Sequence, residues 1–417
     1  MKIFIQFLIL FSISISAQTV STFAGSCSEV DHSLINGQGT VARFYNPSDI
    51  TVDAIGNFYI ADSNNNCIRK ITSSGLVTTL AFSPSNFPVS VAVDSVGNVY
   101  FSAGNYIYKI NAGSNIANVF AGNGIAGYVD DIGTNAEFDT PMGIAIDFND
   151  NIYVADKFNH RIRKITNSGN VTTFAGSTAG NVNGDLATAQ FNSLEGIEID
   201  TTGNFFIADT NNNQIKKISI DGLVSTYIGN GTQSYVDGIG VVASLNQPIN
   251  LTIDSNNNIY FVSKNSNTIR RVTTTGDVTT IAGNRYDGWG GCLNGIGINA
   301  GFSHPTGLVI NQSGDIYVAD KVSNTIRKIT GLLATNYFNL DNQINITPNP
   351  TTNSIYINFE NFISSKITIF DMDGRVIQNN IISENNTAID VTNMANGIYL
   401  IQINSDKGTV FKKIVKQ

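Results

Sequence analysis

The chain has 417 residues and a formal net charge of −8, and only 13% of its residues are charged. This length exceeds that of one ordinary domain and predicts either two domains or a repeat array with a smaller domain. Because phosphate contacts need clustered Lys and Arg, the acidic balance argues against nucleic acid as a partner. The 38 glycines, with many Asn, Thr, Ile and Val residues, favour strands and tight turns and predict an all-β fold.

The first 17 residues have the features of a secretory signal peptide. Lys2 supplies a positive start, residues 3–15 form an apolar run, and a small-residue segment ends at Ala17. This pattern predicts export and cleavage near residue 17. The apolar run is too short to cross a bilayer as a helix, and no later segment is apolar enough, so no transmembrane segment is expected.

The three cysteines, Cys27, Cys67 and Cys292, would meet an oxidising compartment after export. At most one intramolecular disulfide can form, which leaves one cysteine over. The sequence does not choose the pair, and three unpaired thiols are the alternative.

Six copies of one hairpin pattern follow between residues 49 and 320. In each copy a short apolar run ends at an Asp or Asn, and a turn and a second apolar strand come next. The residues that end the first run are 41, 53, 53, 54 and 57 positions apart; they are Asp53, Asp94, Asp147, Asp200, Asp254 and Asn311. Self-similarity at such a period is the signature of a repeat architecture.

The third copy shows what one repeat contains. It reads "GIAID" at 143–147, "NIYVAD" at 151–156, "RIRKI" at 161–165 and "VTTFAG" at 171–176. The Asp that ends the first run is expected to bind N–H groups of its own turn. The "RIRKI" strand is expected to pack one face and leave its other face in water. Four short antiparallel strands per repeat, repeated six times, predict a six-bladed β-propeller.

The two ends of the array predict how the ring closes. The last copy stops after its third strand, at Ile329, and lacks a fourth. A matching strand, "VSTFAG" at 20–25, follows the signal peptide. We therefore expect this N-terminal strand to pair with the third strand of the last blade, which leaves no exposed edge at the seam.

The repeats resemble the NHL repeat, a propeller-forming motif, over about residues 20–330. The shared words are of the form "GIAIDxxGNIYVADxxNxRIRKI". The second copy lacks the Asp that ends the second strand, and the fifth has Ser263 there. The resemblance implies a binding platform more than one particular chemistry.

After a predicted linker at 331–343, residues 344–417 show short alternating strands that predict a small Ig-like β-sandwich. This tail resembles the type A C-terminal sorting domain of the type IX secretion system. The matching residues are Pro348, Asn349, Pro350, Gly374, Gly397, Tyr399, Lys412 and Lys413. The resemblance implies Bacteroidetes-type export, the secretion machinery as partner, and a secreted or outer-membrane-surface location. An unrelated Ig-like adhesion module is the alternative.

The long segments between repeats are expected to share one face of the ring with the turns that join second and third strands, and loops of this kind carry function. Six aromatic or imidazole residues mark this expected ligand face: Tyr128, His160, Tyr235, Tyr286, Trp289 and His304. The alternative is that loop residues only pack on the scaffold. That alternative is preferred for the set that recurs before each blade, namely Phe44, Phe138, Phe191, Leu245 and Phe302. His160, aligned with Thr or Gln of other copies, fits an ordinary turn residue.

The sequence predicts no catalytic, cofactor-binding or metal-binding residues. It contains no Gly-x-Ser-x-Gly, phosphate-binding loop or His-Glu-x-x-His motif. The Asp residues that end second strands could suggest a carboxylate ring, but the favoured interpretation is that each binds the amides of the following turn; they are Asp62, Asp156, Asp209 and Asp320. The segment at Asp237 is interpreted as a turn because it lacks a full calcium-ligand set.

Two functions remain from these observations. The favoured one is a non-catalytic platform that binds a glycan, peptide or protein outside the cell through the inter-blade loops. The alternative is a secreted enzyme, a lactonase-like hydrolase or a lyase, with calcium or zinc in the central channel. An RNA-binding role conflicts with the signal peptide and the acidic balance.

Overall fold

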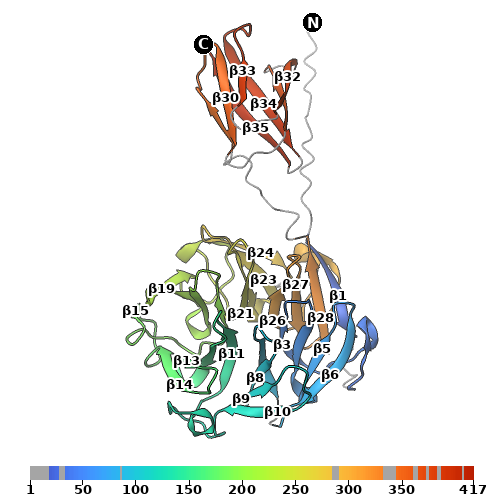
Figure 1. Cartoon of the computed structure of the whole chain (residues 1–417), viewed down its shortest axis with the longest axis vertical. Coiled ribbons are helices and arrows are strands. Elements are labelled where there is room, and N and C mark those ends of the chain that lie inside the picture. The colour runs from blue at the N-terminus through green and yellow to red at the C-terminus, as the bar shows by residue number, and fades with distance from the viewer. Residues whose placement is uncertain are drawn as a thin grey trace. The chain divides into compact units, whose positions relative to one another are not determined.

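The computed structural model describes residues 18–27, 33–84, 87–283, 291–331, 344–359, 365–371, 375–382, 387–405 and 408–417. The predicted signal peptide and linker therefore fall almost entirely outside the described residues, as do Tyr286, Trp289 and Gly374. The chain divides into two compact units, Met1–Leu333 and Ala334–Gln417 (Figure 1). Within the described ranges, no helix is long and apolar enough to cross a membrane.

The first unit is built from six antiparallel sheets, numbered here in chain order. Neighbours in each of the following series are hydrogen-bonded. Sheet 1 contains β2 (Gly37–Gln38), β6 (Leu76–Phe82), β5 (Cys67–Ile71), β4 (Phe58–Asp62) and β3 (Pro47–Val52). Sheet 2 contains β10 (Ala117–Ala121), β9 (Tyr106–Ile110), β8 (Val99–Ala103) and β7 (Pro88–Val93). Sheet 3 contains β14 (Val171–Ala175), β13 (Arg161–Ile165), β12 (Ile152–Asp156) and β11 (Pro141–Ile146).

The remaining three sheets repeat this order. Sheet 4 contains β15 (Gly184–Asp185), β19 (Leu223–Ile228), β18 (Gln214–Ile218), β17 (Phe205–Asp209) and β16 (Ile197–Ile199). Sheet 5 contains β20 (Gly238–Ile239), β24 (Asp277–Ala282), β23 (Thr268–Val272), β22 (Ile259–Ser263) and β21 (Pro248–Ile253). Sheet 6 contains β25 (Gly295–Ile296), β1 (Thr19–Gly25), β28 (Thr325–Thr330), β27 (Ile316–Asp320) and β26 (Pro305–Ile310).

Single turns of 3-10 helix lie between the strands. They are η1 (Gly39–Val41), η2 (Ser63–Asn65), η3 (Gly133–Asn135), η4 (Lys157–Asn159), η5 (Thr210–Asn212), η6 (Gly240–Val242), η7 (Lys264–Ser266) and η8 (Gly297–Asn299).

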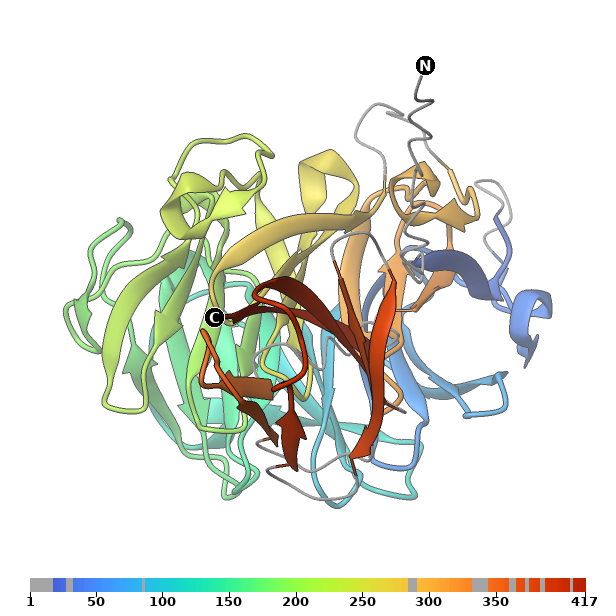
Figure 2. The same ribbon diagram turned by 90° about the horizontal axis from the view of Figure 1, so that it is seen from above.

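The first strand of each repeat contacts the first strand of the next: β3, β7, β11, β16, β21, β26, and then β3 again. In Figure 2 the colours follow one another around the first unit in the same order. The apolar faces of neighbouring sheets form the cores between them. One such core joins Val20 of β1 to Phe302 and to Tyr260 of sheet 5. The predicted all-β fold is confirmed, and the six inner strands surround one axis.

The hairpin turns follow the predicted chemistry. The carboxylate of Asp147 accepts hydrogen bonds from the backbone N–H groups of Asn149 and Asn151, each at 2.9 Å. The Asn151 side chain donates to the same carboxylate at 2.9 Å. Equivalent bonds from the residue four positions on recur at the same place in other copies, at Asp53, Asp94, Asp200 and Asp254. Each turn is thus closed by the Asp that begins it.

The N-terminal strand completes the last sheet as predicted. β1 pairs antiparallel with β28, with Thr19 opposite Thr330 and Gly25 opposite Thr325. A disulfide joins Cys27 to Cys292, with 5.9 Å between their Cα atoms, so the alternative of three unpaired thiols is wrong. Cys67 is free and buried. A strand from the start of the array and a loop near its end are therefore held together by hydrogen bonds and by one covalent bond.

One expectation about the third strands is wrong. Their middle basic residue does not face water: Arg69, Arg163, Lys216, Arg270 and Arg327 are all fully buried. The alternation of apolar and basic residues predicted which side chains share a face. It did not predict that the long segment before five of the six described sheets covers this basic residue.

The second unit contains two antiparallel sheets. One contains β29 (Ile344–Thr347), β30 (Ser354–Phe359) and β33 (Thr387–Asp390). The other contains β32 (Val376–Ile382), β31 (Ser365–Phe370), β34 (Gly397–Ser405) and β35 (Gly408–Lys416). Side chains of both sheets form one core, which includes Ile355 and Ile357 from the first sheet and Ile367, Ile369 and Ile401 from the second.

Candidate binding site at the channel mouth

The inner strands meet around Asp49 of β3. Its carboxylate accepts hydrogen bonds from the Ser90 hydroxyl at 2.7 Å and the Val91 N–H at 3.0 Å, both of β7. It also accepts one from the Asn250 amide of β21 at 2.9 Å. Three sheets are therefore joined through a single side chain in the channel.

Glycines allow this close approach. A Cβ atom on Gly307 would lie 2.5 Å from Cα of Asp49, and one on Gly143 would lie 2.5 Å from the carbonyl oxygen of Glu195. Both contacts are with backbone, which cannot move aside cheaply. These positions need glycine because the inner strands pack backbone to backbone.

Two carboxyl groups inside the channel have perturbed proton affinities. Burial raises the pKa of Asp49 to about 6, against the opposing effect of its hydrogen bonds to Ser90 and Val91. Burial also raises the pKa of Glu198 to about 7, and the charge of Asp49 adds to that rise. Each carboxyl therefore holds its proton at a higher pH than an exposed carboxyl would.

A cavity of about 310 Å³ borders Asp49, at the end of the channel where the inner strands begin. Its apolar wall includes Met142, Ile249 and Val322. The polar and charged lining residues are Ser48, Asp49, Ser90, Glu195, Asn250, Lys264, His304, Thr306 and Lys321. We call this cavity the channel mouth.

The charges at the channel mouth are not balanced. Nζ of Lys157 lies 2.7 Å from a Glu195 carboxylate oxygen. Among the described residues, the ammonium groups of Lys264 and Lys321 form no ion pair or hydrogen bond. Burial lowers the pKa of Lys321, the charge of Lys264 lowers it further, and Glu195 opposes both. With Asp49 included, three lysines face two carboxyl groups, which leaves an excess of one positive charge when both carboxyls are ionised.

Elsewhere in the first unit, the buried cations of the third strands bind carboxylates and backbone carbonyls, although Nε of Arg69, Arg270 and Arg327 has no hydrogen-bond partner among the described residues. Arg163 donates to Asp156 at 2.8 Å and to the carbonyl groups of Glu137 and Val129, each at 2.8 Å. These carbonyls belong to the long segment before sheet 3. We call this arrangement, a buried cation that binds its own sheet and the preceding loop, the loop clamp.

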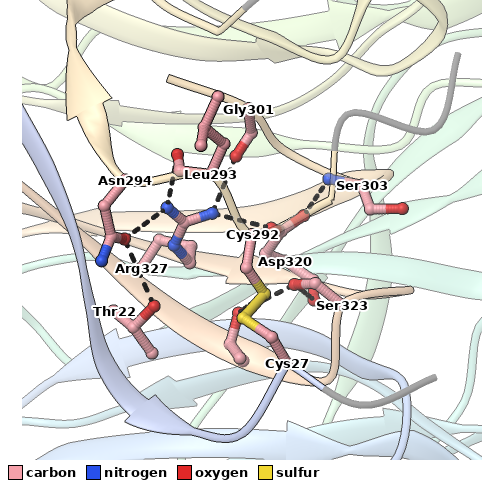
Figure 3. Close-up of a disulfide and its surroundings, with 11 residues drawn as sticks. Thr22, Cys27, Cys292, Leu293, Asn294, Gly301, Ser303, Asp320, Ser323 and Arg327 are labelled. Carbon is pink, nitrogen blue, oxygen red and sulfur yellow. Dashed lines mark hydrogen bonds and ion pairs between the residues drawn. A yellow bond between two sulfur atoms is a disulfide. The ribbon is translucent and has the colours of Figure 1, made fainter. Parts of the chain in front are cut away.

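The loop clamp is complete in four sheets, and in sheet 5 the cation binds only the preceding loop, because Ser263 stands where the other sheets have Asp. Arg69 binds the carbonyls of Arg43 and Ile35, Lys216 those of Gln190 and Val182, and Arg270 those of Ser244 and Val236. In sheet 6, Arg327 binds the carbonyls of Gly301 and Leu293, as Figure 3 shows. The figure also shows the Cys27–Cys292 disulfide beside this clamp. Burial raises the pKa of the partner carboxyl, Asp320, to about 7.

Sheet 2 has no loop clamp. Tyr108 stands at the position of the clamping cation and stacks on Phe101, with 5.0 Å between ring centroids. Ala103 stands at the position of the clamping Asp. Only residues 83–87 separate this sheet from the one before it, so there is no long loop to hold. The loop-binding cation and the long loop are thus present together or absent together, which explains why the second repeat is short.

The Asp residues that end second strands bind the following turn, as predicted, and also bind the preceding loop. Asp62 accepts a hydrogen bond from the N–H of Tyr45 at 2.8 Å and from the Asn65 side chain at 2.8 Å. Tyr45 precedes it by 17 residues, so the carboxylate binds the preceding loop as well as the side-chain amide of Asn65 in the turn that follows. In the described part of the chain, no group of three or more His, Cys, Asp or Glu residues could hold a metal ion.

The recurring apolar residues before each blade are scaffold residues, as preferred. Phe44, Phe138, Phe191, Leu245 and Phe302 are all buried. The guanidinium carbon of Arg163 lies 5.1 Å from the ring centroid of Phe138. These side chains therefore pack the loops onto the clamps.

His160 has a structural task, although its alignment with Thr or Gln was wrong. It has a left-handed backbone, with φ of 55°, and its Nδ1 accepts a hydrogen bond from the N–H of Ser193 in the next blade at 3.1 Å. Burial lowers its pKa, so the neutral acceptor form is favoured. Asn side chains make the same link in the other copies; they are Asn66, Asn105, Asn213, Asn267 and Asn324.

The other predicted ligand-face residues separate into two groups. His304 is exposed and lines the channel mouth. The Tyr128 hydroxyl hydrogen-bonds that of Thr173 at 2.7 Å, and its ring lies 4.1 Å from the guanidinium of Arg161. Tyr128 and Tyr235 are both exposed, and neither lines the cavity. Sequence reasoning missed Lys264 and Lys321, although both directly follow the end of a second strand, as Lys157 does.

In the second unit, a sorting-motif residue near the start of the unit contacts its last strand. The Asn349 side chain accepts a hydrogen bond from the N–H of Val415 in the last strand, at 2.9 Å. Asn349 lies between Pro348 and Pro350 near the start of the unit. The buried Tyr399 donates its hydroxyl to the carbonyl of Ala395 at 2.8 Å. Lys412 and Lys413 are on β35, and Leu400 of β34 pairs with Lys413.

Two protein families match the chain. The family described as NHL repeat matches residues 44–71 and 302–329. The family described as secretion system C-terminal sorting domain matches residues 345–417. The two predicted resemblances are therefore confirmed.

Curated relatives share only parts with this chain. Protein SUPPRESSOR OF QUENCHING 1, chloroplastic, of Arabidopsis thaliana is 28% identical over 269 residues, which are 60% of this chain and 26% of the relative. NHL repeat-containing protein 2 of Bos taurus is 39% identical over 100 residues, 23% of this chain and 14% of the relative. The chain thus spans about a quarter or less of the length of these relatives.

Solved structures of similar fold come from Bacteroides. An auxiliary nutrient binding protein from Bacteroides thetaiotaomicron has a TM-score of 0.61 and 17% identity, over 75% of this chain and 76% of that one. A protein of unknown function from the same organism has a TM-score of 0.60 and 19% identity, with the same coverage of both chains. At these identities the likeness shows the fold alone. Together with the sheets described above, these matches identify the chain as one that carries NHL repeats followed by a type IX secretion-system sorting domain.

Proposed function

We propose that residues 18–330 form a six-bladed NHL propeller, with the N-terminal strand completing the last blade. Six sheets whose first strands contact in sequence support this count, as do the six links that His160 and the five Asn residues make. We assign residues 1–17 to a signal peptide, 331–343 to a linker, and 344–417 to an Ig-like sorting sandwich. The two sheets with a shared core in the second unit support that last assignment.

We further propose that the chain is cargo of the type IX machinery and ends up secreted or on the outer-membrane surface. The sorting-domain match at residues 345–417 carries this proposal. The test compares the full chain with a chain that ends at residue 343, both expressed in a bacterium that has this export route. The full chain should reach the surface or the medium, and the shortened chain should stay in the cell. Equal export of both would contradict the proposal.

For the exported propeller, we propose the role of a binding platform for a glycan, peptide or protein. The observation that carries it is the channel mouth, a lined cavity whose charged residues differ from the repeated scaffold residues. One structural neighbour is an auxiliary nutrient binding protein, which is in keeping with this role. Tyr128, Tyr235, Tyr286, Trp289 and His304 are proposed contacts on the same face, with His160 as support for the loop.

The test is binding of the purified full chain to arrays of extracellular glycans and peptides. The proposal expects a reproducible set of bound ligands, and a signal reduced by mutation of channel-mouth residues. Uniformly absent binding would count against a platform of this kind.

A secreted enzyme, a lactonase-like hydrolase or a lyase, is the second candidate. Asp49 and Glu198 favour it because two carboxyls with raised pKa values in one channel suit proton transfer. Calcium or zinc would be its cofactor. Metal analysis of the purified protein, with lactone and lyase substrates as activity probes, distinguishes this candidate from a platform.

A further inference from the structure

Three repeats place a lysine directly after the second strand. These residues are Lys157, Lys264 and Lys321, in sheets 3, 5 and 6. Two other repeats have a hydroxyl residue there, and it bonds to the neighbouring inner strand. The Ser63 hydroxyl donates to the carbonyl of Pro88, and that of Thr210 to the carbonyl of Pro248 at 2.8 Å. An uncharged hydroxyl residue can therefore fill this position in the scaffold, and a lysine is not needed there for folding.

The three lysines gather positive charge where the scaffold does not need it. Glu195 forms an ion pair with Lys157 at 2.7 Å, and its charge also acts on Lys321. Lys264 and Lys321 both line the channel mouth and interact repulsively, and neither has an ionic partner among the residues that the structure describes. Like charges held together without a partner destabilise a protein unless a ligand neutralises them.

The cavity also limits the size of the ligand. At about 310 Å³ it lies at the small end of ligand pockets. A single sugar ring or a molecule of similar size fits such a volume. The lining includes hydroxyl and amide groups of Ser48, Thr306 and Asn250, each of which also donates a hydrogen bond within the scaffold, and an apolar wall that includes Met142 and Ile249. This mixture suits a small polar molecule that carries one anionic group.

We propose that the channel mouth binds a monosaccharide-sized anion, whose carboxylate, sulfate or phosphate group contacts Lys264 and Lys321. The inference rests on the proposed binding function and names its ligand class. Charge-assisted hydrogen bonds from two ammonium groups would hold the anion. Glu195 would keep Lys157 in place and limit the total positive charge.

The test is calorimetric titration of the full chain with D-glucuronate and with D-glucose, which differs by lacking the charge. Inorganic sulfate and inorganic phosphate are titrated separately. Glucuronate, sulfate or phosphate should bind, and added salt should weaken the binding. Comparison of the three probes then identifies the preferred anionic group. Glucose that binds as well as glucuronate, or the failure of all three anions to bind, would overturn the proposal.

Variants connect the binding to these residues. Lys264→Met and Lys321→Met should each weaken binding by about ten-fold or more. The matched control is Lys217→Met, on β18 outside the cavity, which should leave the affinity unchanged. Glu195→Gln should tighten binding because it removes a negative charge from the mouth, a result that loss of structure would not produce. Unchanged affinity in both lysine variants would also overturn the proposal.

These outcomes separate the two proposals. Array ligands that bind equally to the wild-type chain and to the Lys264→Met and Lys321→Met variants would preserve the platform function and overturn the anion site. Absence of all array binding, with glucuronate bound through the lysines, would preserve the anion site and remove the wider platform function.

Discussion

Arg163 and Lys321 both bring a positive charge into the first unit, but their surroundings differ. Arg163 is fully buried, pairs with Asp156 and binds two loop carbonyls. Lys321 is only partly buried, has a like charge nearby and lines a cavity. A loop-binding cation is present wherever a long loop precedes the sheet. Lys264 and Lys321, in contrast, hold no loop in place. A buried charge that is paired in its own sheet therefore indicates scaffold, and a partly buried charge without an ion pair at a cavity indicates a ligand site.

The largest expected effect is removal of a clamp cation. Arg163→Met should lower the free energy of unfolding by about 3–5 kcal/mol, because it leaves Asp156 buried without its partner and two loop carbonyls unsatisfied. Urea unfolding followed by circular dichroism measures this. The neighbouring Lys164→Met is the control, with an expected loss below about 1 kcal/mol. Similar losses in both variants would remove the distinction between clamp and surface cations.

Loss of the disulfide comes next. Cys27→Ser with Cys292→Ser should lower the free energy of unfolding by about 2–4 kcal/mol, since the bond joins residues 265 positions apart and constrains the unfolded chain. Cys67→Ser is the matched control for the loss of a cysteine without a bridge. If the double variant were as stable as the wild type, hydrogen bonds between β1 and β28 alone would account for closure.

Substitution of an unpaired carboxyl should raise the free energy of unfolding, whereas substitution of a clamp cation should lower it. The pKa of Glu198 is raised to about 7, so its favourable contribution is complete below pH 4.5 and is lost as pH rises through 7. Glu198→Gln should match the wild type at pH 4 and be more stable at pH 8 by about 1–2 kcal/mol. Full enclosure would give ~3 kcal/mol, but Glu198 is partly exposed to the channel. Urea unfolding at both pH values measures the difference, and a pH-independent difference would contradict this account.

The smallest effect concerns His160. His160→Asn should change the free energy of unfolding by less than about 0.5 kcal/mol, because Asn makes the same link between blades in the other repeats and tolerates a positive φ. His160→Ala should cost about 1–2 kcal/mol, since it removes the acceptor for the Ser193 N–H and strains the backbone. Thermal unfolding of both variants measures this, and a costly Asn substitution would indicate a role for imidazole beyond the link.

Much of the fold could be predicted because the repeat is local. Hairpin turns closed by Asp147 and its equivalents depend on residues four positions apart, and the closing strand follows from a missing fourth strand. The burial of Arg163 could not be predicted, because the loop that covers it lies more than 20 residues earlier. The repeats did contain a signal: the second copy lacks the long loop, the clamp cation and the clamp Asp together.

The site was predicted less well than the fold. The search for aromatic and imidazole residues selected His304, which lines the channel mouth, but missed Lys264 and Lys321. Their shared position after a second strand is visible in the sequence. Their lack of partners, and the cavity between them, depend on side chains from several blades and appear only in three dimensions.

The most direct test of the central claim is the free energy of unfolding of Lys321→Met, measured by urea denaturation without ligand. If Lys321 is an unpaired cation that serves a ligand, its replacement removes the repulsion from Lys264. The replacement also removes the cost of burying a charge. The variant should then be as stable as the wild type or more stable. A loss of about 3 kcal/mol or more, like that expected for Arg163→Met, would contradict the distinction between scaffold and ligand-site cations.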